Sequence, residues 1–418
     1  MALRQLARDA SMPAILAGII ATLVSFAGPL VIIFQAASGL PPAQLASWVW
    51  AIAMGSGVLG VALSLRYRVP VVVAWSIPGS VLLVSLLPTV DFAVAVGAYL
   101  VASAVILLVG LSGLFDRLVA KLPAAIPAAM LAGILFGFAT ELFVGMKAQP
   151  LLVLAMFAGF FVGRRLFPRY AVVLVLLIGI VIALGSGQVR GQLPALQLTA
   201  PIWVTPRFDW QAVLNIALPL VVVAITGQFM PGIALLRSSG YHTPAAGPLV
   251  AWSAAGSALL APFGCHGLNL AAVTAALCTG PEAHDDPARR YVAGVSGGVL
   301  YLLLGLFAGA VLALFATLPK ELIATLAGLA LFPTIASALS GAVADPGDRD
   351  AALVTFIVSA SGMSLFGLGA AFWSLLLGMA AHLLLRHRRA TSSSTTAPAQ
   401  ETRMPCSNTP SRDQGSTP

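Results

Sequence analysis

Apolar runs of 18 residues or more recur along nearly the whole of this 418-residue chain. Each run is long enough to cross the hydrocarbon part of a bilayer as a helix. Within lipid the backbone has to satisfy its own hydrogen bonds, which leaves either helices or a closed barrel. The runs are continuous rather than alternating, so a barrel is excluded. The sequence therefore predicts an all-α polytopic membrane protein.

The charge pattern agrees with a membrane protein and not with a nucleic-acid-binding one. Only 9% of the residues are charged, against about 25% in soluble domains. The net charge is +8, but the basic residues lie singly or in pairs between apolar runs. Such a distribution is typical of loops on the cytoplasmic side of a membrane. We therefore expect the lipid bilayer as a partner and no nucleic acid.

The apolar runs predict about 14 membrane spans, several of them short. They lie near 12–36, 44–65, 70–87, 91–114, 122–146, 149–163, 170–187, 210–236, 244–261, 263–279, 291–318, 321–343, 351–365 and 367–385. An even count places both termini on one side, and that side then collects 18 of the 22 lysines and arginines. The positive-inside bias predicts that both termini are cytoplasmic, in a bacterial inner membrane.

Two halves of the chain resemble each other, which predicts an internal repeat. The clearest match pairs "LPAAIPAAMLAGILF" (122–136) with "LPKELIATLAGLALF" (318–332). Seven spans per half is an odd number, so the second repeat has to be inverted, as in many secondary transporters. Chance similarity between helices rich in alanine and leucine is the alternative. The predicted organisation is a first repeat at 1–187, an outer loop at 188–209, a second repeat at 210–388 and a disordered cytoplasmic tail at 389–418.

The third and tenth spans are interrupted at corresponding positions. In the third span, β-branched residues follow Pro70, and Pro78 and Gly79 suit the start of a short helix. In the tenth span, Pro262, Gly264 and Gly267 precede an expected helical stretch at 268–277. Each span therefore reads as an extended piece and a half-helix. Inverted half-helices would point their positive ends at the midplane, where a carboxylate can bind. The alternative is a pair of kinked helices without a ligand.

Polar side chains in the interrupted spans are the first candidates for a site. His266 is titratable at membrane depth, so it could carry a proton, or it could be a neutral histidine bonded to the backbone. Asn269 could donate to a carboxylate or hold two helices together. Gln228 precedes Pro231 and is either a ligand or a packing residue.

Aromatic and acidic residues complete the set of candidates. Phe26 and Trp75 could stack on a ring, although most membrane aromatics serve packing. Glu141 is a second proton candidate, but its place near a span end favours a solvated role. The candidate substrate-binding residues are Phe26, Gln35, Ala74, Trp75, Ser76, Gly79, Gln228, Met230, His266, Gly267 and Asn269.

Motifs for other chemistry are missing from the sequence. The loop 280–291 contains the contiguous residues His284, Asp285 and Asp286, but they lack helical metal-ligand spacing. We read this loop as a cytoplasmic cap, with Arg289 and Arg290 at the membrane surface. The chain shows no Walker A, GxSxG, HExxH or CxxC motif. We expect no metal, no cofactor and no enzymatic activity.

Several motifs together resemble a known family over about residues 10–388. They are "PVVVAWSIPGSVLL", "QFMPGIALLRSSGY", "PFGCHGLNLAAVTAALCTG" and "DPARRYVAGV". The chain resembles the benzoate:proton symporter (BenE-type) family and, more distantly, the seven-plus-seven inverted-repeat transporters of nucleobases and sulfate. The resemblance implies a core domain of spans 1–4 and 8–11 and a gate domain of spans 5–7 and 12–14. It also implies homodimers through the gate and import of benzoate with a proton.

The resemblance implies a substrate between the third and tenth spans, and from the interrupted spans we predict how it binds. The carboxylate would lie on the N–H groups of residues 75–79 and 267–269, and the ring against Phe26, Trp75 and Met230. Nucleobase relatives use acidic residues in spans 8 and 10, where this chain has Gln228 and His266. A nucleobase is therefore disfavoured. A nucleobase or inorganic-anion transporter on the same fold stays open as an alternative, as does a passive anion channel.

Overall fold

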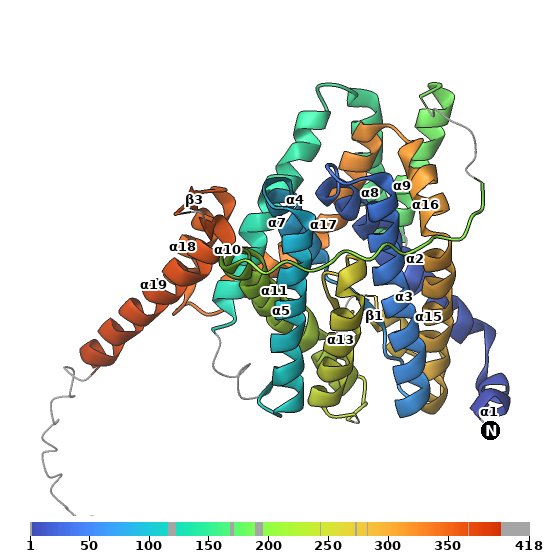
Figure 1. The fold of residues 1–418 in the computed structure, drawn as a ribbon, viewed down its shortest axis with the longest axis horizontal. Coiled ribbons are helices and arrows are strands. Elements are labelled where there is room, and N and C mark those ends of the chain that lie inside the picture. The colour runs from blue at the N-terminus through green and yellow to red at the C-terminus, as the bar shows by residue number, and fades with distance from the viewer. Residues whose placement is uncertain are drawn as a thin grey trace, which may run out of the picture.

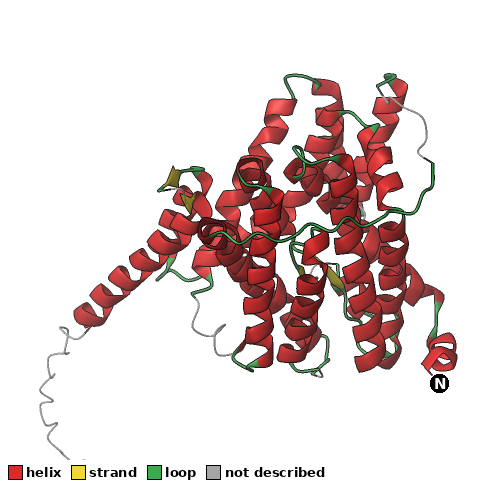
Figure 2. Ribbon diagram, in the orientation of Figure 1, coloured by secondary structure: helices red, strands yellow, loops and turns green. Residues whose placement is uncertain are grey.

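The computed structural model describes residues 2–115, 123–167, 171–188, 195–242, 244–271, 274–281, 283–366 and 368–393. Most of these residues are helical, and the strands among them form two short antiparallel pairs (Figures 1 and 2). The first half contains α1 (Ala2–Asp9), α2 (Met12–Ala36), α3 (Pro42–Tyr67), β1 (Val73–Trp75), α4 (Ile77–Leu86), η1 (Leu87–Thr89), α5 (Phe92–Leu111), α7 (Ala125–Gly145), α8 (Pro150–Leu166) and α9 (Ala171–Gly185).

The second half begins after an extended strap. It contains α10 (Trp210–Ala212), η2 (Val213–Ala217), α11 (Leu218–Ala224), η3 (Ile225–Phe229), α12 (Met230–Ser238), α13 (Ala246–Leu260), η4 (Ala261–Phe263), β2 (Leu268–Leu270), α14 (Ala276–Thr279), η5 (Pro287–Arg289), α15 (Tyr291–Leu306), α16 (Ala308–Ala316), α17 (Lys320–Ala342), α18 (Arg349–Ala360), β3 (Ser364–Leu365), β4 (Leu368–Gly369) and α19 (Ala370–Ser393). Within the described residues, six helices are long and apolar enough to cross a membrane, or seven if the bent pair α15–α16 is one span.

The two halves repeat one packing pattern. Helix α3 of the first half packs against α15 of the second. Helix α13, the counterpart of α3 in the second half, packs against α5 of the first. Likewise α8 packs against α9, and α18 against α19. A strand and a short helix follow α3, and a strand and a short helix follow α13. These two strands, β1 and β2, pair antiparallel. The two halves therefore run in opposite directions, as an inverted repeat requires.

The helices form two groups. The first group contains α2–α5 and α10–α15 and encloses a continuous apolar core. The second group contains α7–α9 and α17–α19, in which α7 packs against α17, α18 and α19. Val31, Ile32 and Val81, from α2 and α4, are buried together with leucines of α7 and α17. The boundary between the two groups is therefore an apolar surface.

The structure corrects several expected boundaries. The span expected at 291–318 is broken at Phe307, where α15 and α16 meet at 72°. The helix expected from Leu268 is wrong, because residues 268–270 form a strand and the helix begins at Ala276. The N-terminal residues before the first span form a separate helix, α1. The last helix continues to Ser393, and residues 394–418 of the expected disordered tail lie outside the described residues.

The described part of the expected outer loop, residues 195–209, is an extended strap that crosses the first helix group (Figure 1, green). Backbone hydrogen bonds fix the strap at three places: Thr199 N to Leu306 O, Val204 N to Pro262 O and Arg207 N to Ala93 O. Ser47 Oγ accepts a further bond of 2.8 Å from Ile202 N. The strap is therefore attached to α3, α5, η4 and α15 before the chain enters α10.

Candidate functional site

The two interrupted segments cross near the middle of the first helix group. β1 pairs with β2 in the register Val73 to Leu270, Ala74 to Asn269 and Trp75 to Leu268. The bond from Ser76 N to Gly267 O continues the ladder, and Gly267 has a φ of 150°, which favours glycine. The extended piece expected in the third span is confirmed. The ladder brings the candidates Ala74, Trp75 and Ser76 beside Gly267 and Asn269.

The side chain of Ser76 caps the first turn of α4. Ser76 is the N-cap, and its Oγ accepts a hydrogen bond of 3.0 Å from Gly79 N. Pro78 follows in the first turn and has no N–H group to offer. Of the N–H groups expected to bind a carboxylate, those of Ser76 and Gly79 are therefore bonded within the protein. The positive end of α4 stays available to an anion through its dipole.

On the β2 side the half-helix does not begin at Leu268, because residues 268–270 form a strand and the described helix begins at Ala276, so the expected N–H donors are arranged differently. Leu268 N donates to Ser257 Oγ at 2.8 Å, and Asn269 is held in the strand ladder. Asn269 is 2% exposed, and its amide Nδ2 has no hydrogen-bond partner among the residues that the structure describes. An unpartnered buried donor is costly, so this amide is the group on β2 best suited to a polar ligand.

His266 lies beside the crossing and is 2% exposed. Its Nδ1 is 3.1 Å from Trp48 Nε1 of α3. Its Nε2 is 2.9 Å from Ser80 Oγ and 3.1 Å from Ser76 O, both at the start of α4. Neither Trp48 nor Ser80 could be assigned as its partner from the sequence, because each is about half the chain away from His266.

The two aromatic candidates pack against each other and against a third ring. Phe26 and Trp75 have ring centroids 5.4 Å apart in an edge-to-face arrangement. Tyr301 of α15 completes the cluster at 6.0 Å from Trp75 and 6.3 Å from Phe26. All three side chains are buried. In this conformation they pack against one another, and any stacking on a substrate ring would need one of them to turn.

Gln228 and Met230 lie on a distorted helix. Residues 225–229 form the π-helical turn η3, which ends at Met230 and packs against β2 and α7. Such turns are often found at functional sites, and no compositional signal in the sequence indicated one here. The side chain of Gln228 is half-buried. Gln228 therefore lies where the crossing meets the second helix group.

The two remaining candidates lie apart from the crossing along their helices. Gln35 is in the last turn of α2, and its buried Oε1 has no hydrogen-bond partner in the described part of the chain. Glu141 is in α7, and its side chain lies outside the described residues.

A cavity of about 10 Å³ lies between β2 and helices α5, α11 and α13. Ser103, Ser257, His266 and Asn269 are among the residues that line it. This volume is about that of one water-sized probe. An aromatic acid can therefore reach the crossing only if the surrounding helices separate.

The two helix groups are also joined by a polar contact between η2 and β4. Asn215 of the π-helical turn η2 accepts a hydrogen bond of 2.7 Å at its Oδ1 from Gly369 N of β4. The turn η2 packs against both β4 and α19. A relative movement of the two groups has to stretch or break this bond.

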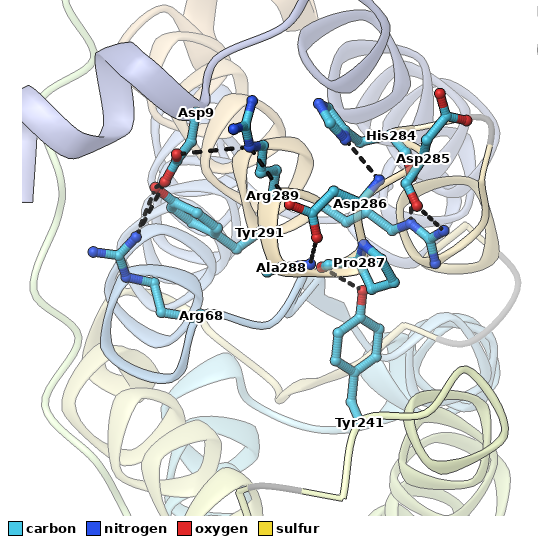
Figure 3. Close-up of polar contacts among 11 residues, drawn as sticks. Asp9, Arg68, Tyr241, His284, Asp285, Asp286, Pro287, Ala288, Arg289 and Tyr291 are labelled. Carbon is cyan, nitrogen blue, oxygen red and sulfur yellow. Dashed lines mark hydrogen bonds and ion pairs between the residues drawn. The ribbon is translucent and has the colours of Figure 1, made fainter.

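The end of the molecule that carries α1 is held by a network of ions and hydrogen bonds (Figure 3). Asp9 contacts Arg68 at 3.4 Å and Arg289 at 4.0 Å, and it accepts a bond of 2.9 Å from the Tyr291 hydroxyl. The Tyr241 hydroxyl donates to Pro287 O at 3.0 Å, and burial raises the pKa of Tyr241. These contacts join α1, α3, α12 and α15.

Arg290 is buried, contrary to the expected position at the membrane surface. It is 8% exposed, and its guanidinium donates to Thr279 O, His284 O and Asp285 O. Arg289, by contrast, has a side chain that is 48% exposed. Arg290 therefore satisfies three carbonyl groups of the segment that follows α14.

Replacing Arg290 with leucine is expected to destabilise the protein by about 2–3 kcal/mol, because the buried carbonyl of Thr279 and the part-buried carbonyls of His284 and Asp285 lose a charged donor. Arg289→Leu is the matched control, for which we expect a change of less than about 1 kcal/mol, since exposed ion pairs contribute little. Thermal unfolding in detergent measures both. Equal effects of the two substitutions would show that Arg290 does not hold this segment.

Comparison with known proteins gives the relationships of the chain. A family model described as benzoate membrane transport protein matches residues 8–384. The chain is 43% identical over 385 residues to the benzoate membrane transport protein of Acinetobacter baylyi, covering 92% of this chain and 98% of that one. It is 40% identical over 375 residues to the inner membrane protein YdcO of Escherichia coli, covering 89% and 96% of the two chains.

Solved structures of more distant proteins share the fold. SLC26A9 superposes with a TM-score of 0.61 at 14% identity, covering 90% of this chain and 65% of its own. The transmembrane domain of the cyanobacterial bicarbonate transporter BicA gives 0.55 at 15% identity, covering 90% and 96%. These proteins have the inverted-repeat transporter fold. Because the family model and both curated relatives match most of the chain, the expected family is confirmed: the chain belongs to the benzoate membrane transport (BenE) family.

Proposed function

We propose that this protein imports benzoate or a related aromatic carboxylate together with a proton by alternating access. The observation that carries the proposal is the crossing of two interrupted segments beside the apolar boundary between the helix groups. Such crossings are the binding sites of secondary transporters with inverted repeats. The aromatic carboxylate follows from the family, one member of which is named a benzoate membrane transport protein.

The chemistry of the crossing supports an anion that is neutralised during transport. Among the described residues, the buried polar side chains around β1 and β2 are serine, asparagine and histidine, with no aspartate or glutamate. A buried carboxylate would repel an anionic substrate. A lone carboxylate is itself costly to bury in a dry site. A proton that travels with the substrate removes that cost, which is the physical reason for coupling.

The movement is proposed to be a displacement of the first helix group, as the core, against the second, as the gate. The apolar boundary can slide without leaving unpaired charges. We further propose that the α1 end faces the cytoplasm of a bacterial inner membrane, and that two copies associate through the gate helices. The arginines at this end agree with the positive-inside bias.

Uptake of radiolabelled benzoate into proteoliposomes tests the proposal. With an inward proton gradient we expect accumulation above equilibrium that a protonophore abolishes, and no comparable accumulation in protein-free liposomes. Transport of uracil or sulfate in place of benzoate would overturn the substrate assignment. Equilibration without accumulation would indicate a passive channel and would overturn the coupling.

A further inference from the structure

The contacts of His266 fix where its proton lies. The indole N–H of Trp48 can only donate a hydrogen bond. Nδ1 of His266, 3.1 Å from Trp48 Nε1, therefore accepts and carries no hydrogen. The neutral ring then has its hydrogen on Nε2. The side chain is thus in a single tautomer that its protein partners select.

The partners of Nε2 agree with that tautomer. Ser76 O, at 3.1 Å, can only accept a hydrogen bond. Ser80 Oγ, at 2.9 Å, donates its own hydrogen to Ser76 O at 2.8 Å, so it presents lone pairs to the ring. One Nε2–H group therefore satisfies both contacts. Each atom of the ring that can form a hydrogen bond has a partner of the right kind.

A second proton on the ring would conflict with this arrangement. An imidazolium has two donors, so its Nδ1–H would face the Trp48 N–H at the present separation. Tyr99 of α5 also lies near the ring, with centroids 6.3 Å apart, Cys265 precedes His266 in the chain, and Ser103, Ser257 and Asn269 line the same small cavity. Among the described residues of α3, α4, α5 and β2 that contact His266, none is an acid that could balance the charge.

We propose that His266 is a positioning residue, held neutral by Trp48, that fixes the start of α4 against α3 and β2, and that the transported proton is bound elsewhere. It links three parts of the site: α3 through Trp48, the start of α4 through Ser76 and Ser80, and β2 through the backbone that leads from His266 into Leu268. The cap of Ser76 on Gly79 depends on this placement. The inference departs from the expected role of His266 as a proton carrier, and its transport readouts rest on the proposed function.

Uptake by three variants tests the inference. The amide of His266→Gln offers both an acceptor and a donor but cannot titrate, so uptake should slow by up to about tenfold while remaining driven by the proton gradient. His266→Ala removes all three contacts and should lose uptake by more than about 100-fold. Trp48→Phe keeps an aromatic ring but frees Nδ1 to take a proton. It should introduce a loss of uptake toward acidic pH that the wild type lacks.

The result that would overturn the inference is specific. A folded His266→Gln protein that still exchanges labelled for unlabelled benzoate, but no longer accumulates it with a proton gradient, would identify His266 as the proton carrier. Trp48→Phe with the pH profile of the wild type would also contradict the role of Trp48.

A spectroscopic measurement keeps the inference independent of transport. Nitrogen chemical shifts of protein labelled with ¹⁵N-histidine distinguish the two tautomers, and the His266→Gln spectrum assigns the signal. We expect the Nε2–H form between about pH 5 and pH 8. An Nδ1–H or doubly protonated ring in that range would refute the assignment, even if benzoate proved not to be the substrate. Failure of wild-type accumulation with the expected tautomer would instead refute the proposed function alone.

Discussion

Gly18→Ala is expected to prevent accumulation of folded protein. Gly18 of α2 lies directly on the backbone of α15, where an added Cβ would overlap Ala293 O and lie 2.8 Å from Gly297 N. Backbone atoms cannot move aside as a flexible side chain can. Overpacking usually costs about 1–3 kcal/mol and more where a backbone must shift, so we expect a loss at or above the top of that range. Close approach through small residues is how membrane helices associate.

The measurement is the yield and thermal stability of monodisperse protein in detergent. Gly185→Ala is the matched control, because Gly185 is also helical and an added Cβ there has no neighbour within 4 Å. The control should match the wild type. If Gly18→Ala unfolds at the same temperature as the wild type, α2 and α15 do not pack with the described closeness.

Gln228→Glu is expected to abolish benzoate uptake at neutral pH. Gln228 lies on the turn η3, which packs against both β2 and α7, and we propose that the negative charge of the substrate lies close to it. Two like charges about 4 Å apart repel by about 4 kcal/mol at an effective dielectric constant near 20, which corresponds to about a 1000-fold loss. Because a glutamate loses its charge in acid, uptake should partly recover as the pH falls.

Gln228→Leu separates charge from shape. It removes the amide without adding charge, so we expect a loss of about tenfold that does not recover in acid. Initial rates of labelled benzoate uptake between about pH 5 and pH 8 measure both variants. Uptake into protein-free liposomes is subtracted at each pH, because neutral benzoic acid crosses lipid more readily than the benzoate anion. Wild-type rates in Gln228→Glu would show that Gln228 does not contact the substrate.

The sequence predicts one interrupted segment better than the other, for a physical reason. In the third span, β-branched residues after Pro70 favour an extended chain, and Ser76 with Pro78 marks a helix start, so local preferences agree with the observed boundary. In the tenth span, residues 268–277 are mostly good helix formers. Pairing with β1 nevertheless keeps Leu268–Leu270 extended. That pairing is a tertiary contact, which local propensity does not contain.

The residues of the candidate site likewise divide into those that the sequence could indicate and those that only the fold reveals. Phe26 and Trp75 could be named because aromatic side chains in interrupted or polar spans suit a ring, but their mutual contact is known only from the fold. Tyr301 was missed, since a tyrosine within an apolar helix has no local signal that distinguishes packing from binding. The π-helical turns were missed because one extra residue in a helical turn leaves composition and hydrophobic pattern almost unchanged. The burial of Arg290 depends on carbonyl groups whose direction only the fold determines.

The strap at residues 195–209 supplies a fixed reference frame for measuring distances within the working protein. Leu198 on the strap is 70% exposed, and the backbone bonds of Thr199 tie its neighbourhood to α15. Leu151 on α8 is 75% exposed and belongs to the second helix group. A spin label at Leu198 would report the position of the first group alone, so its distance to a label at Leu151 reads the displacement between the groups directly. A second pair, from Leu198 to a label at the exposed Leu259 of α13, stays within one group and calibrates that reading.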